Sequence, residues 1–336
     1  MAILVCGGAG YIGSHTVSEL LDKGEDVIVV DNLQTGHREA VLEGVKLYVG
    51  DLRDTTFLNE VFANNEIGAV VHFAADSLVG ESVENPLKYY DNNVNGALCL
   101  LQTMVKHNVK KIVFSSTAAT YGEAKEFPIA EETLTEPTNP YGETKLAIEK
   151  MLKWSEQAYG MKYVVLRYFN VAGAHMDGKL GEDHTPETHL IPIILQVALG
   201  KREKINIFGD DYDTYDGTCI RDYIHVTDLA DAHILAIEKL RRDGISGTYN
   251  LGNGNGFTVK EVIAAARKVT NHPIPAEVVT RRAGDPARLV ASSEKAMTEL
   301  GWQPRYTSLE QMIQSAWRWF QKHPAGYSKE KVTRDF

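Results

Sequence analysis

Residues 5–13 read VCGGAGYIG, a cluster of glycines between an apolar run and a helical pattern. Gly7, Gly10 and Gly13 form the spacing Gly-x-x-Gly-x-x-Gly, the spacing Gly-x-Gly-x-x-Gly is also satisfied, and the helical pattern starts at Tyr11. Such a turn lets the backbone approach a pyrophosphate, whose charge then lies at the N-terminus of a helix. The stretch therefore predicts the first βαβ unit of a dinucleotide-binding fold.

A second apolar run, Val27–Val30, follows that helix and ends at Asp31, 18 residues after Gly13. An acidic side chain here can accept hydrogen bonds from the adenosine ribose hydroxyls and would repel a 2′-phosphate. The alternative is an ordinary βαβ turn that binds no ligand. The glycine spacing and the acidic residue together favour bound NAD, and favour it over NADP.

Composition narrows the class of protein further. The 336 residues are enough for two domains, and 43% hydrophobic with 24% charged residues is ordinary for a soluble protein. The formal charge of −10 argues against nucleic acid or an anionic membrane as a partner. Three cysteines lie far apart, which favours a reducing compartment and predicts neither disulfides nor a zinc site. No apolar run approaches the ~20 residues of a membrane span, so we expect a cytoplasmic protein. We also expect no metal site.

Short apolar segments alternate with helical patterns as far as Tyr168. Continuous apolar strands between helices predict an α/β fold with a doubly wound parallel sheet, the Rossmann arrangement. Beyond Tyr168 the pattern breaks, which predicts a smaller α/β substrate domain interleaved with the first. We expect the first domain to comprise residues 1–170 and about 219–250, and the second to comprise about 171–218 and 251–336.

The spacing Tyr-x-x-x-Lys places a phenol and an ammonium one turn apart on a helix, where the ammonium favours phenolate, a competent base for a hydroxyl. The chain holds three copies, of which those at Tyr121 and Tyr327 lie in loop-like and tail-like sequence. Tyr141 follows an Asn-Pro helix start and is preceded by a strand that ends in hydroxyls at residues 115–117. We therefore interpret Tyr141 and Lys145 as a catalytic pair; the alternative is a surface i,i+4 pair.

Sequence motifs along nearly the whole chain match the motifs of a single protein family. They include GGAGYIGSH, VVDNL, HFAADSLVGES, FSSTAATYGE, NPYGETK and RYFNVAGAH, with the more specific RDYIHV at 221–226 and RRAGDPAR at 281–288. Together they resemble the UDP-glucose 4-epimerase family within the extended short-chain dehydrogenase/reductase superfamily. The resemblance implies an isomerase that reversibly inverts C4 of the hexose of a UDP-sugar, UDP-galactose to UDP-glucose, through a 4-keto intermediate with tightly bound NAD.

The resemblance also implies roles for individual residues. Thr117 matches the catalytic hydroxyl, Tyr141 the base and Lys145 the lysine that binds the NAD ribose. The NAD-binding set is Gly7, Gly10, Tyr11, Ile12, Gly13, Asp31, Asn32, Asp51, Leu52, Phe73, Ala74, Ala75, Ser115, Tyr141, Lys145 and Tyr168. The set that binds the UDP-hexose is Thr117, Asn170, His189, Leu190, Asn206, Phe208, Arg221, Arg282 and Asp285. The resemblance implies a homodimer as well, in which helices around Leu98–Val105 and Leu146–Trp154 form the interface.

Four positions depart from the usual pattern of the family. Thr117 replaces the commoner serine, which keeps the hydroxyl and adds a methyl group. Ser77 stands where a lysine often contacts the NAD phosphate, and His189 stands where an asparagine usually binds the diphosphate. Leu289 occupies the position that controls entry of N-acetylated sugars, where a tyrosine excludes them and a small residue admits them. Leucine is intermediate in size, so acceptance of N-acetylated UDP-hexoses stays open.

Other functions remain as alternatives. A nucleotide-sugar 4,6-dehydratase of the same superfamily needs a carboxylate after the catalytic hydroxyl, whereas Thr117 is followed by Ala118-Ala119-Thr120. A net dehydrogenase would need exchangeable NAD. A non-catalytic NAD-sensing module would have no need for the hydroxyl, the phenol and the ammonium together.

Overall fold

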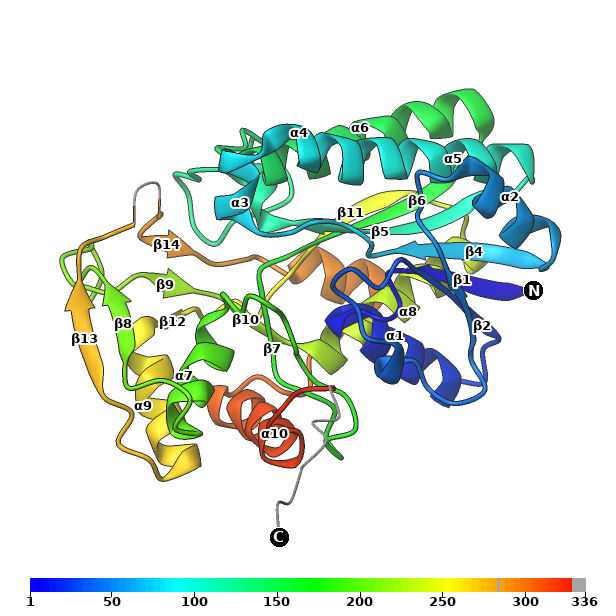
Figure 1. Ribbon diagram of the computed structural model, residues 1–336. Coiled ribbons are helices and arrows are strands. Elements are labelled where there is room, and N and C mark those ends of the chain that lie inside the picture. The colour runs from blue at the N-terminus through cyan, green and yellow to red at the C-terminus, as the bar shows by residue number, and fades with distance from the viewer. Residues whose placement is uncertain (283–284, 328–336) are drawn as a thin grey trace, which may run out of the picture.

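A seven-stranded parallel sheet forms the centre of the larger part of the molecule (Figure 1). The computed structural model describes residues 1–282 and 285–327. The order of the strands is β11-β6-β5-β4-β1-β2-β3. Their bounds are β1 (Ala2–Cys6), β2 (Val27–Asp31), β3 (Lys46–Val49), β4 (Ile67–His72), β5 (Lys111–Thr117), β6 (Lys162–Tyr168) and β11 (Gly247–Leu251). The predicted doubly wound sheet is confirmed.

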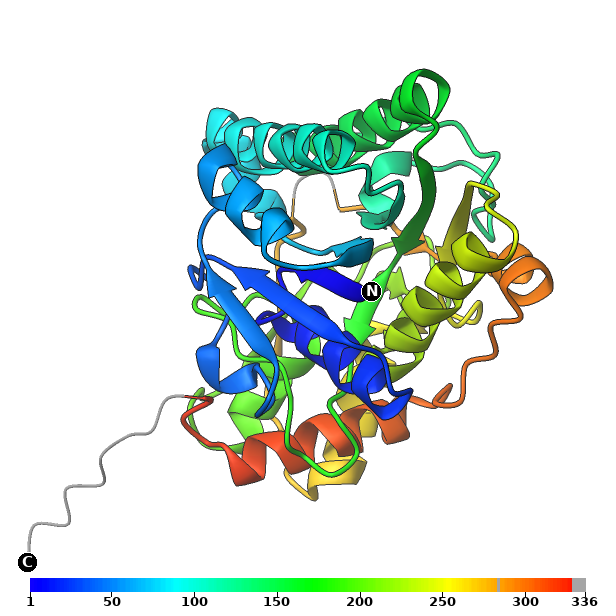
Figure 2. The ribbon, with the colours of Figure 1, turned by 90° about the vertical axis from the view of Figure 1, so that its right-hand side faces the viewer.

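Helices cover both faces of this sheet. In Figure 2 the cyan and green helices α5 and α6 lie on one side of the strands, and the blue α1 lies on the other. The helices that pack with the sheet, or join its strands, are α1 (Tyr11–Asp22), α2 (Thr55–Ala63), α3 (Val79–Glu84), α4 (Pro86–Tyr89), α5 (Gly96–Lys106), α6 (Pro140–Tyr159) and α8 (Val226–Arg242). Short 3-10 or π turns, η1 (Arg38–Ala40), η2 (Tyr90–Asn95) and η3 (Ala118–Tyr121), complete this part.

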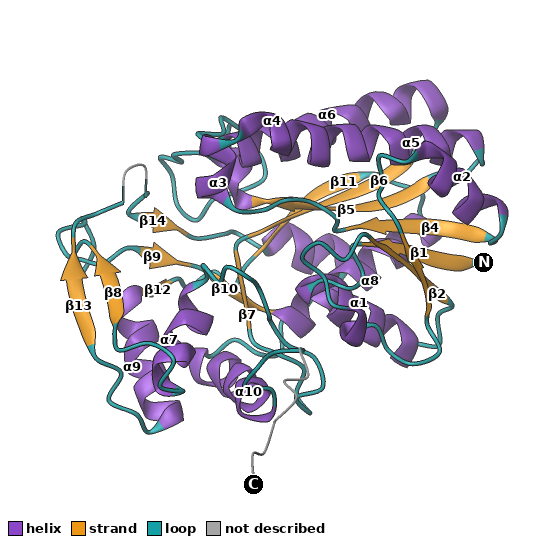
Figure 3. Ribbon diagram, viewed as in Figure 1, coloured by secondary structure: helices purple, strands orange, loops and turns teal. Residues whose placement is uncertain are grey.

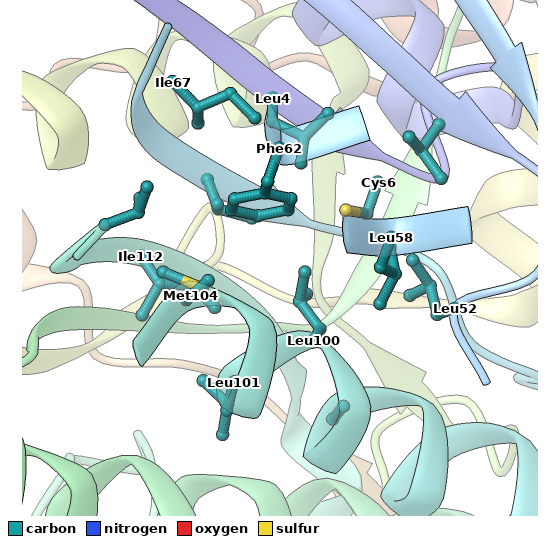
Figure 4. Close-up of a cluster of buried hydrophobic side chains, with 14 of the residues drawn as sticks. Leu4, Cys6, Leu52, Leu58, Phe62, Ile67, Leu100, Leu101, Met104 and Ile112 are labelled. Atoms are coloured by element: carbon teal, nitrogen blue, oxygen red, sulfur yellow. The ribbon is translucent and has the colours of Figure 1, made fainter. Parts of the chain in front are cut away.

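Successive residues of β1 enter two different cores. Leu4 and Cys6 pack with α2 and α5 in the cluster drawn in Figure 4, whereas Ile3 and Val5 pack with α1 and α8 on the opposite face. All five residues of β1 are buried. This is the period of two expected for a strand covered on both sides, and it explains why the strand is apolar without interruption.

The smaller part holds short sheets and helices, at the left and bottom of Figure 3. Its strands are β7 (Asn170–Ala172), β8 (Ile205–Phe208), β9 (Ile220–Arg221), β10 (Tyr223–His225), β12 (Phe257–Thr258), β13 (Ala276–Val279) and β14 (Arg288–Leu289). Its helices are α7 (Leu190–Ala198), α9 (Val259–Thr270) and α10 (Leu309–Lys322), which share one apolar core. Trp302 and the turn η4 (Ala296–Leu300) pack instead in the core beside α8. The division into two domains stays a prediction.

Among the described residues, no helix combines the length and the apolar character needed to cross a membrane.

Candidate functional site

The glycine turn after β1 is too tight for side chains. Gly7 has φ of +81°, and a Cβ there would lie 2.7 Å from the backbone nitrogen of Ala74. A Cβ on Gly13 would lie 2.1 Å from the carbonyl oxygen of Gly7. Helix α1 then begins at Tyr11 without a side chain capping its first turn. The turn is therefore a cradle of exposed backbone at a helix N-terminus, which is the geometry that a pyrophosphate requires.

Asp31 ties this turn to the end of β2. Its Oδ2 accepts the Ala9 N–H at 2.9 Å and its Oδ1 accepts the Leu33 N–H at 2.9 Å. Burial raises the pKa of the carboxyl, and these two hydrogen bonds oppose that rise. Each carboxylate oxygen accepts about two hydrogen bonds, so the side chain keeps capacity for the hydroxyls of a ribose.

Two adjoining cavities contain nearly all of the predicted site residues. A cleft of about 1010 Å³ runs from the glycine turn past Tyr141 to Arg282. A neighbouring cavity of about 330 Å³ adds Leu190, Asn206, Phe208 and Arg221. The residues common to both are Asn170, Val171, Thr188, His189, Arg282 and Asp285. One continuous space is therefore long enough to place two ligands end to end.

Ser115 is the one predicted site residue that lines neither cavity. It is fully buried, and its Oγ lies 2.7 Å from Nε2 of His233 on α8. Its carbonyl oxygen accepts a hydrogen bond of 2.8 Å from Lys145 Nζ. Ser115 thus positions Lys145 through its backbone.

Tyr141 and Lys145 lie in the first turns of α6, as their spacing predicts. The side chain of Asn139 caps the helix by accepting the Gly142 N–H at 2.9 Å, and Pro140 occupies the first helical position. Tyr141 is 9% exposed, and burial raises its pKa to about 12 although a hydrogen bond with Thr117 lowers it in part. Lys145 is 3% exposed, and burial lowers its pKa to about 7 although Glu149 opposes this.

A buried ionic network joins helix α6 to the neighbouring strands through Glu149. The sequence patterns did not predict this network. Glu149 accepts two hydrogen bonds from Arg167, at 2.5 and 3.0 Å, and a third from Ser116 at 2.5 Å. Arg167 also donates to the hydroxyl of Tyr121 at 2.8 Å, which donates to Asn250 at 2.7 Å. Tyr121, from a second Tyr-x-x-x-Lys copy, therefore has a structural partner instead of a place in the cleft.

The arginines at the far end of the cleft already have partners. Arg221 forms an ion pair with Asp285 and donates to the Pro286 carbonyl at 2.9 Å. The guanidinium of Arg282 lies 3.8 Å from the centroid of the Phe208 ring, a cation–π contact. Asp222 does not pair with Arg221, since its carboxylate accepts backbone N–H groups of residues 253, 254 and 291.

His189 lies on the wall of both cavities and is half-exposed. Its Nδ1 lies 2.7 Å from Oε1 of Glu182, and the nearby carboxylates raise its pKa to about 10. Ser77 and Leu289, which also depart from the usual pattern of the family, line the larger cleft as well.

Comparisons with known proteins agree with this geometry. The model of the NAD dependent epimerase/dehydratase family matches residues 3–252. The UDP-glucose 4-epimerase of Halalkalibacterium halodurans is 65% identical over 330 residues, covering 98% of each chain. A crystal structure of a UDP-glucose 4-epimerase superposes with a TM-score of 0.96 at 65% identity, covering 98% of this chain and 100% of the other. The enzyme from Bifidobacterium longum, solved in complex with NAD⁺ and UDP, superposes with a TM-score of 0.92 at 46% identity, covering 97% and 100%.

Proposed function

Since this chain belongs to the NAD dependent epimerase/dehydratase family, we propose that it interconverts UDP-galactose and UDP-glucose by inverting C4 of the hexose. One observation carries the proposal: a single cleft runs from the glycine turn past the buried Tyr141 to Arg282, where the smaller cavity with Arg221 adjoins it. Relatives of high identity are UDP-glucose 4-epimerases, and a related structure holds NAD⁺ and UDP together.

The residues around the glycine turn suit NAD. The chain can form this tight turn only because Gly7 and Gly13 lack Cβ atoms, which would collide with the backbone of residues 73–74 and 7–8. Asp31 can accept from the adenosine ribose, and Asp51 with Leu52 lines the cleft where the adenine would lie. NAD bound by these residues would supply the acceptor, and then the donor, of the hydride at C4 of the sugar.

Tyr141 is the proposed base. Its Oη removes the proton of the sugar 4-hydroxyl and later gives it back to the oxygen of the 4-keto sugar. Burial opposes loss of the phenol proton, so a neighbouring positive charge must stabilise the phenolate. Lys145 is held in place by the Ser115 carbonyl at 2.8 Å and supplies that charge, and Thr117 orients the reacting oxygen through its hydrogen bond with the phenol.

The far end of the cleft is the proposed site for UDP. Arginine binds phosphate oxygens through a planar pair of donors. Arg221 and Arg282 line the smaller cavity together with Asn206 and Phe208, and Arg202 lines it as well. Asp285 is the proposed acceptor for the uridine ribose. Asn170, His189 and Leu190 also line this cavity.

Incubation of the purified protein with UDP-galactose and no added NAD tests the reaction. We expect UDP-glucose to form without net NADH. A 4-keto-6-deoxy product would indicate a dehydratase, and a requirement for added NAD with NADH release would indicate a dehydrogenase. Either result, or no turnover, would refute the proposal. The tripeptide after Thr117 holds no carboxylate for dehydration.

We also propose a homodimer in the cytoplasm. Leu98 and Val105 on α5 are 42% and 37% exposed, and Trp154 on α6 is 65% exposed. Such apolar side chains on neighbouring helices suit an isologous interface. Sedimentation measurements that give only the monomer mass would contradict the dimer.

The proposed cytoplasmic location rests on the cysteines. All three are free and buried, in keeping with a reducing compartment.

A further inference from the structure

Four potential metal ligands converge in the segment 182–189, which precedes α7. Glu182, His184, Glu187 and His189 each offer one ligand atom, and these atoms all lie within 4.8 Å of one another. We call these residues the 182–189 cluster. Three of them, all but Glu187, line the larger cleft. Two imidazoles and two carboxylates are a donor set typical of zinc and similar divalent transition metals.

The spacing of these atoms suits a tetrahedral ion. His189 Nδ1 lies 2.7 Å from Glu182 Oε1 and 3.3 Å from Glu187 Oε1. His184 Nδ1 lies 3.1 Å from Glu182 Oε1 and 3.9 Å from Glu187 Oε2. Ligands at about 2.0–2.1 Å from a tetrahedral ion are about 3.3–3.4 Å apart. The four separations surround that value, and one ligand atom from each residue lies within 4.8 Å of the others.

The surrounding structure holds the cluster in this arrangement. The side chains of both glutamates are only 5% exposed. The Glu182 carbonyl accepts the indole N–H of Trp319 at 3.2 Å. Glu187 Oε1 accepts the N–H groups of Thr188 and His189, both at 2.8 Å, which leaves Oε2 directed toward His184. A set of ligands fixed before binding loses little entropy when an ion enters.

One detail of the geometry suits a shared ion. The Nδ1 atoms of both histidines point to the same Oε1 of Glu182, with ring centroids 5.4 Å apart. An ion placed between these atoms would contact both rings and the Glu182 carboxylate at once.

We propose that the 182–189 cluster binds one divalent cation of the zinc class. The four protein ligands close the coordination sphere, as in structural sites, so the ion fixes the wall of the cleft and takes no part in the chemistry at Tyr141. Coordination through Nδ1 leaves the Nε2–H of His189 as a hydrogen-bond donor. This proposal stands independently of the proposed reaction.

Isothermal titration of tag-free, chelator-treated protein with zinc chloride tests the site. We expect one ion per chain, and His184→Gln should weaken its binding at least about tenfold. His175→Gln is the matched control, because His175 lies nearby in the chain and pairs with the exposed Asp177, which is outside the 182–189 cluster. Absence of stoichiometric binding, or equal affinity in wild type and His184→Gln, would overturn the proposal.

A second measurement uses the wild-type chain alone, so that a poorly folded variant does not decide the matter. X-ray absorption of the zinc-loaded protein should show nitrogen and oxygen ligands at about 2.0 Å. Sulfur ligation would assign the ion to a cysteine instead and refute the site. The melting temperature of the wild type should also rise with zinc, and at the same zinc concentration that of His184→Gln should rise less.

Discussion

Replacing Arg167 by methionine tests whether the network behind α6 holds the catalytic helix in place. The side chains of Arg167 and Glu149 are each 8% exposed. The substitution removes two of the three hydrogen bonds that Glu149 accepts, and only the one from Ser116 remains. Breaking a buried ion pair by removing one partner leaves an uncompensated charge and costs about 3–5 kcal/mol. We therefore expect the free energy of unfolding to fall by about that amount at neutral pH.

Urea denaturation followed by circular dichroism measures this loss, and a double-mutant cycle shows its origin. Arg167→Met with Glu149→Met replaces the whole pair by apolar side chains of comparable length, and such replacements are often nearly neutral. The double variant should therefore be more stable than Arg167→Met alone. Lys204→Met is the control, because its pair with Glu277 is exposed and should contribute little. Additive losses in the cycle would refute the reasoning.

Three further predictions concern the cleft and its surroundings. Tyr141→Phe removes the proposed base, so turnover should fall at least about 100-fold while NAD, measured after denaturation, stays bound; near-normal turnover would contradict the assignment. Leu289→Tyr should lower the rate with UDP-N-acetylglucosamine relative to UDP-glucose, and an unchanged ratio would argue against control of sugar size at this position. Burial lowers the pKa of His233 to about 4 from 6.5, so the folded protein excludes a proton that the unfolded chain binds. Stability present above pH 6.5 should thus be lost toward pH 4, by about 2 kcal/mol at pH 5 for this group; an unfolding free energy that stays constant over this range would contradict it.

Local patterns in the sequence were sufficient for the parallel sheet and for the position of the catalytic pair. Asp31 ends a buried strand and Tyr141 follows an Asn-Pro helix start, so each position depends on a few neighbouring residues. Helix α6 begins at Pro140 and is capped by Asn139, as that start predicts. Short-range physics, namely strand burial and helix capping, therefore explains this part of the agreement.

Such local patterns could not predict contacts between segments that are distant in the chain. Arg167 and Tyr121 are 46 residues apart and meet only because β6 lies beside β5 in the sheet. Ser115 lies near the end of β5, as expected, yet its hydroxyl contacts His233, 118 residues away, instead of lining the cleft. The 182–189 cluster lies in a stretch without hydrophobic period, where no regular element indicates which side chains converge. These features depend on how elements pack, and periodicity in one segment does not contain that information.

The alternation of β1 between two cores has a consequence for natural sequence variation. Neighbouring residues of Ala2–Cys6 pack in cores on opposite faces of the sheet. None of them therefore faces solvent, where a substitution would disturb no packing. A substitution or one-residue slip here disturbs packing on at least one side of the sheet. Variants in these five residues should therefore reduce the amount of protein in the cell, whereas the molecules that do fold keep a normal rate per active site. Variants in the cleft should show the reverse, and measuring abundance and specific activity separately distinguishes the two classes.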